Sequence, residues 1–159
     1  IHGAITGAIA DVKAVYAKAG VGSGIIGLGN ENVTFTDTGS VPAADIDTIN
    51  TATTGNIAFD STVTTIGGDL ADINKVVAAA SATPTTVDAS ALALIINPTD
   101  TGGLDIADVN TLAGKVTGVV KATLKTTGDA GVELFGALTV CFSTKEMSET
   151  VDIFLKEEI

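Results

Sequence analysis

The 159-residue chain has no arginine and no tryptophan, and it has a single histidine, cysteine, methionine and tyrosine. Because the only histidine, His2, stands at the start of the sequence, one chain cannot build a Ser-His-Asp triad, a Cys-His pair or a multi-histidine metal site. One cysteine, Cys141, excludes an intramolecular disulfide. Without arginine or tryptophan, and with one tyrosine, the chain also has little with which to line a sugar groove. These absences predict a non-enzymatic protein.

Positive charge is also scarce. Eight basic residues, all lysine, stand against 19 acidic ones, and the formal net charge is −11. This balance repels phosphate and anionic lipid headgroups, so neither nucleic acid nor a membrane surface is expected as a partner. No apolar run approaches the roughly 18 residues needed to span a bilayer.

What the sequence does contain is an internal duplication. Residues 99–102 read Thr-Asp-Thr-Gly and residues 107–112 read Ala-Asp-Val-Asn-Thr-Leu. Nearly the same text occurs 63 positions earlier, as Thr-Asp-Thr-Gly at 36–39 and Ala-Asp-Ile-Asp-Thr-Ile at 44–49. Such self-similarity at one offset is the sequence signature of a repeat protein.

The frame Ala-Asp-hydrophobic-x-x-hydrophobic occurs four times, and its two hydrophobic residues fall on one helix face. It predicts four short helices with an aspartate in the first turn of each, where a negative charge faces the positive end of the helix dipole. The helices are expected at 5–19, 42–52, 69–80 and 105–115, with Asp11, Asp45, Asp72 and Asp108 near their starts.

Strands are predicted where β-branched and aromatic residues gather, at 32–37, 56–59, 62–66 and 117–124, while 81–98 fits either a helix or a strand. Residues 38–40 read as a turn and Gly67-Gly68 as a break. The expected fold is an α/β solenoid of about four helix-and-strand layers with a mainly parallel sheet. A β-solenoid without helices is the alternative.

The repeat region is expected to cover residues 1–127, because the amino-acid composition changes after it. Residues 128–159 hold three of the five phenylalanines and five of the six glutamates. We expect a β-rich segment here, with one long strand at 134–142 and either another strand or a short amphipathic helix at 150–155. This segment either caps the array or pairs with the open edge of another copy. The assembly residues proposed on this basis are Phe135, Phe142, Val151, Ile153, Phe154 and Leu155.

Two stretches are candidates for ligand sites. Asp37 and Asp100 occupy equivalent Thr-Asp-Thr-Gly turns and are the candidate ligands for calcium, although aspartates in such turns more often bond their own backbone, within the turn, than a metal. No other cofactor is expected. The Gly-rich run at 20–29 lacks both a preceding strand and a following Lys-Ser or Lys-Thr, so it does not read as a phosphate loop.

The text at 27–38, 43–55 and 63–74 resembles repeat modules of very large secreted or cell-surface proteins, chiefly of marine cyanobacteria. The resemblance covers roughly residues 5–127, implies a structural or adhesive role at the cell surface, and carries over no catalytic motif. Residues 128–159 depart from the pattern.

The sequence therefore predicts a structural subunit of an extracellular filament or surface layer, which polymerises head-to-tail with copies of itself. The alternative is a monomeric adhesin or ligand-binding module of a larger surface protein, stabilised by calcium. The chain begins at Ile1 and shows no signal peptide, so either processing removed one or the chain is a piece of a longer protein.

Overall fold

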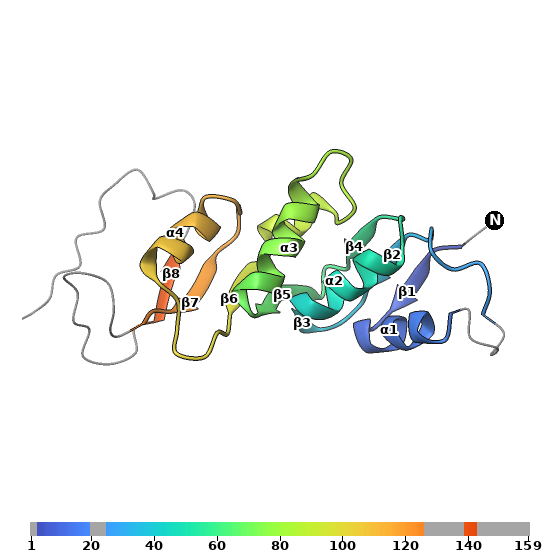
Figure 1. Cartoon of the computed structure of the whole chain (residues 1–159), viewed down its shortest axis with the longest axis horizontal. Helices are drawn as coiled ribbons and strands as arrows, with labels where there is room; N and C mark the ends of the chain where they lie inside the picture. The colour runs from blue at the N-terminus through green and yellow to red at the C-terminus, as the bar shows by residue number, and fades with distance from the viewer. Residues whose placement is uncertain (1–2, 20–24, 126–138, 143–159) are drawn as a thin grey trace, which may run out of the picture.

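The structure, a computed structural model, describes residues 3–19, 25–125 and 139–142. It is a mixed α/β structure that extends along one axis, with β1 at one end and β8 near the other (Figure 1). In chain order its elements are β1 (Ile5–Gly7), α1 (Ile9–Ala17), β2 (Val33–Phe35), β3 (Gly39–Pro42), α2 (Ala43–Ala52), β4 (Ile57–Phe59), β5 (Val63–Gly68), α3 (Leu70–Ser81), the 3-10 helix η1 (Ala89–Ala93), β6 (Ile95–Pro98), α4 (Ile106–Ala113), β7 (Val120–Thr123) and β8 (Thr139–Phe142).

The strands form two open sheets. The first has the order β1-β2-β4 and is wholly parallel. The second has the order β3-β5-β6-β7-β8, and only its last strand, β8, runs antiparallel to its neighbour. Parallel neighbours require crossover connections, which helices provide here. Helix α2 packs against both α1 and α3 (Figure 1).

The predicted parallel arrangement and the four predicted helices are confirmed. Each helix begins within one residue of its Ala-Asp frame, and each has the expected aspartate in its first turn. Of the eight periodic hydrophobic residues, Val15 is only partly buried. The others are buried against the sheets: Val12, Ile46, Ile49, Ile73, Val76, Val109 and Leu112. The alternative of a helix-free β-solenoid is therefore wrong.

The first helix is shorter than predicted. Ile5 lies four residues before Ile9, which is helical spacing, but Ile5–Gly7 forms strand β1 and pairs in parallel with Val33–Phe35. The helix begins only at Ile9, after the extended residue Ala8. A distant strand partner thus outweighs the local periodicity.

Two other predictions need correction, and the structure assigns the stretch that the sequence left undecided. Residues 39 and 40, which the sequence assigns to a turn, belong to strand β3 beside β5, and Gly39 has a φ of +90° that turns the chain into it. Gly67 and Gly68 do not break β5 but end it. The undecided stretch 81–98 contains the end of α3, the 3-10 helix η1 and strand β6.

The duplication also appears in the contacts. Val33 pairs with Ile57, and the pair at the equivalent positions of the second copy is Ile96 with Val120. Thr54 donates both its N–H and its hydroxyl to the carbonyl of Gly29, and its counterpart Thr117 donates both to the carbonyl of Leu92. Both halves therefore make the same hydrogen bonds to the segment that precedes them.

Two glycines lie where backbone segments far apart in the sequence come into close contact. A Cβ on Gly55 would lie 2.0 Å from the carbonyl oxygen of Glu31, and one on Gly118 would lie 2.0 Å from that of Leu94. These two contacts are again related by the offset of the duplication. Only glycine fits, because backbone meets backbone at both points.

The core is continuous from Ile9 to Leu124 and consists mostly of valine, isoleucine and alanine. Phe35 and Phe59 form its one ring contact within the described part of the chain, edge-on at 5.8 Å between centroids. No helix in the described ranges is long and apolar enough to cross a membrane.

Candidate functional site

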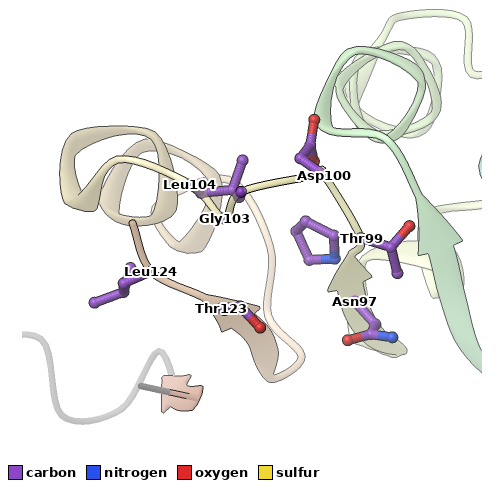
Figure 2. A pocket seen from close by; sticks show the side chains of 9 residues that line it. Asn97, Thr99, Asp100, Gly103, Leu104, Thr123 and Leu124 are labelled. Carbon is purple, nitrogen blue, oxygen red and sulfur yellow. The ribbon is translucent and has the colours of Figure 1, made fainter. Parts of the chain in front are cut away.

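A pocket with a volume of about 490 Å³ lies beside the second Thr-Asp-Thr-Gly turn. Figure 2 shows Asn97 and Thr99 on the β6 side of the pocket, Thr123 and Leu124 at the end of β7 on the other side, and Asp100, Gly103 and Leu104 on the connection from β6 to α4. The full lining is Asn97, Pro98, Thr99, Asp100, Gly102, Gly103, Leu104, Thr123 and Leu124.

This pocket forms because the residues after the second Thr-Asp-Thr-Gly turn pair less closely with the neighbouring strand than the residues after the first turn do. After the first turn, Gly39–Pro42 pairs with β5 at once. After the second, Gly102 and Gly103 both take positive φ values, and only a single bridge, Leu104 with Leu124, forms beyond them. The gap between this bridge and β6 is the pocket.

The candidate calcium ligands Asp37 and Asp100 lie at separate sites. Asp37 Oδ2 accepts the N–H of Ile9 at 2.8 Å, and Asp100 Oδ2 accepts the N–H of Leu70 at 2.9 Å. Each carboxylate thus satisfies the first amide of a helix, α1 or α3, from the adjoining layer. No group of three or more His, Cys, Asp or Glu residues that could hold a metal is found among the described residues. Calcium at these turns stays a prediction.

The pocket lining offers limited chemistry. Its one ionisable side chain is Asp100, which is engaged by Leu70, and its other polar side chains are those of Asn97, Thr99 and Thr123. A site of this kind can hydrogen-bond a small polar group but has no base and nucleophile held together.

A second polar site, which the sequence analysis missed, is buried between the C-terminal ends of α1 and α2. We call it the Glu31 cluster, formed by Tyr16, Glu31 and Thr53 with the amide of Gly29. Glu31 is 3% exposed. Its carboxylate accepts the Gly29 N–H at 3.0 and 2.9 Å and the Tyr16 hydroxyl at 3.0 Å. Thr53 donates its hydroxyl to the Glu31 carbonyl at 2.8 Å.

The protonation of this cluster follows from its contacts. Burial opposes the charge on Glu31, but hydrogen bonds from the amides of Gly29, Glu31 itself and Asn30 and from Tyr16 outweigh it and hold its pKa below the ordinary 4.5. Burial, together with the neighbouring carboxylate, raises the pKa of Tyr16. Glu31 is therefore an ionised, hydrogen-bonded carboxylate at neutral pH.

The equivalent cluster in the second half of the chain is apolar. Alignment of the Ala-Asp frames of α1 and α3 places Val77 at the position of Tyr16. The offset of the duplicated text places a leucine at the position of Glu31 and a valine at that of Thr53. These residues, Leu94 and Val116, pack with Val77 in or against the hydrophobic core. The signal for the Glu31 cluster is visible in the sequence, because Glu31 is the only glutamate before residue 133.

Lysine–aspartate pairs join the exposed faces of neighbouring helices. Lys13 on α1 pairs with Asp45 on α2. Lys75 on α3 lies 3.1 Å from Asp47 on α2 and 2.7 Å from Asp72 on its own helix. Such exposed pairs contribute little to stability.

Most of the proposed assembly residues lie outside the described residues. Phe142 ends strand β8, with its backbone opposite Val120. The others, Phe135, Val151, Ile153, Phe154 and Leu155, fall in the ranges that the structure does not describe.

Comparisons with protein-family models, with curated proteins and with solved structures find no match to this chain.

Proposed function

We propose that the chain is a non-enzymatic structural subunit of an extracellular filament or surface layer, built as a solenoid of α/β layers that stack head-to-tail on further copies. The observation that carries this proposal is the recurrence of the same interlayer contacts in both halves of the duplication, at Thr54 and Thr117 and at Gly55 and Gly118. In a stacked array, the end layers expose the surface that interior layers bury, unless a cap or another copy covers it.

The arrangement of the last strands supports a special role for the C-terminal segment. Ile57 on β4 is followed in the first sheet by a parallel bridge from Val87. At the equivalent residue of β7, Val120, the neighbour is the antiparallel strand β8. A change of strand direction at this position interrupts the parallel array, as a cap or an assembly strand does.

The test is the assembly state of the full chain and of two variants at high concentration, measured by sedimentation velocity. One variant lacks residues 143–159, and the other keeps them but carries serine at the four apolar positions Val151, Ile153, Phe154 and Leu155. Both should remain monomeric and keep the helical circular dichroism of the repeat region. A control with serine at Lys156, Glu157 and Glu158 should polymerise like the intact chain.

The rival function is a monomeric adhesive module whose tail folds back onto its own layers. It predicts a monodisperse monomer from the intact chain at every concentration. That result would remove the assembly proposal and leave the adhesive module.

A further inference from the structure

We infer that the β1–α1 end of the molecule is the acceptor surface for a second copy of this chain; this inference rests on the proposed function. The argument begins with the position of β1 in the repeat. Thr36 N–H bonds to the carbonyl of Gly7 at the end of β1, and Thr99 N–H bonds to that of Gly68 at the end of β5. Asp37 likewise accepts the first amide of α1, and Asp100 accepts the first amide of α3. These matching contacts make β1–α1 the equivalent of β5–α3.

The β5–α3 unit, which lies in the interior of the array, shows what a surface equivalent to the β1–α1 end binds. On its N-terminal side, β5 is covered by the parallel strand β3, with Val41 opposite Ile66 and Pro42 opposite Gly67. On the same side, α3 is covered by α2. A strand-and-helix layer of this chain is thus complementary to a β5–α3 surface.

At the β1–α1 end, no such covering layer is present among the described residues, and the apolar side chains there are more exposed than their interior equivalents. In the interior, the three equivalent residues are at most 2% exposed: Ile66, Val76 and Ala80. At the end they are only partly buried: Ile5, Val15 and Ala19. We call these three residues, together with Thr6 on β1, the end face.

The backbone of β1 is unpaired on the same side. Ile5 donates its N–H to Asn32 at 2.8 Å, and Gly7 accepts from Thr36 at 3.1 Å, so alternate residues of β1 face β2. In a parallel strand the residue between them, Thr6, directs its N–H and C=O to the opposite side. Within the described residues β1 pairs with β2 alone, and these two groups of Thr6 are open to another strand.

The occupant that fits is a second copy. In the interior, the surface that covers β5 and α3 is another strand-and-helix layer of the same chain, β3 and α2. The last strand of the second sheet is β8, which lies away from β1 along the long axis (Figure 1). Because the two ends differ, contact between them is heterologous and repeats without closing.

The test compares the full-length protein with variants of the end face by sedimentation velocity and electron microscopy. Thr6→Pro removes the outward N–H but leaves the β1–β2 bonds, since proline is tolerated on an edge strand. Val15→Lys places a charge in the end face, where burial in a contact is costly. The matched control is Ala78→Lys, at an exposed position of α3. Circular dichroism and thermal melting check that each variant folds.

Both end-face variants should raise the critical concentration for assembly by about tenfold or more, the change that a loss of about 1.4 kcal/mol per contact gives, while Ala78→Lys should leave it unchanged. If the intact chain polymerises and folded Val15→Lys polymerises equally well, the end face is not the acceptor, although the structural function stands. If the intact chain never assembles, both proposals are overturned.

Discussion

Replacing Glu31 with glutamine should destabilise the fold at neutral pH, because the charge is held by buried donors. Both carboxylate oxygens accept the Gly29 N–H, so the amide nitrogen of a glutamine would face this donor in either orientation, and the neutral amide would also lack the charge that the Gly29 and Tyr16 donors stabilise. Losing hydrogen bonds to a buried charged group costs about 1–3 kcal/mol. In a chain of this size that corresponds to a fall in Tm of about 2–4 °C for each kcal/mol.

The sign of the pH dependence distinguishes the charge from simple packing. The pKa of Glu31 is lower in the folded state than its ordinary 4.5. Its contribution to stability is therefore fully present above the ordinary pKa and is lost as the pH falls through the folded pKa. The difference in unfolding free energy between the native chain and Glu31→Gln should be largest at about pH 7 and should shrink at about pH 3.

Urea titrations at several pH values measure this difference, with Glu158→Gln, next to the last residue of the sequence, as the control for loss of one charge. A triple variant with Tyr16→Val, Glu31→Leu and Thr53→Val imitates the apolar cluster of the second half. It should recover the stability that Glu31→Gln loses and show little acid dependence from this site, since apolar replacement of a whole buried polar group is often neutral. A difference between the native chain and Glu31→Gln that stays constant from neutral to acid pH would refute the reasoning.

The remaining predictions concern the repeated turns and close approaches. Asp37→Ala and Asp100→Ala should each lower the free energy of unfolding by about 0.5–2 kcal/mol, the range for losing a helix cap, as measured by urea titration. The two effects should add because the two aspartates share no partner. A strongly non-additive double variant would contradict this. Gly55→Ala and Gly118→Ala should each cost about 3 kcal/mol or more, since overpacking against backbone cannot relax, whereas Gly3→Ala, with open space around its Cβ, should melt like the native chain. Thermal melting with calcium and with chelator checks the two aspartates as ligands, and identical curves would end that prediction.

The sequence predicted the helices well because their frame combines two independent local signals. Alanine-rich turns with hydrophobic residues three apart fix both the helix and its buried face, and the early aspartate marks the start. Ile46 and Ile49, for example, are fully buried on the expected face of α2.

The strands and the polar sites were predicted less well, because they depend on partners far along the chain. Ile5 has helical spacing to Ile9 but is held in β1 by its pairing with Val33 on β2. The carboxylates of Asp37 and Asp100 were expected to bond within their own turns, yet each binds a helix of the adjoining layer. Such pairings are fixed by how the layers stack, which periodicity does not encode.

Negative-stain electron microscopy of the intact chain at high concentration tests the central claim most directly. Head-to-tail stacking of layers predicts unbranched filaments from the pure protein, formed without added ligand or partner. A field of separate monomers at the highest concentration that stays soluble would contradict the account.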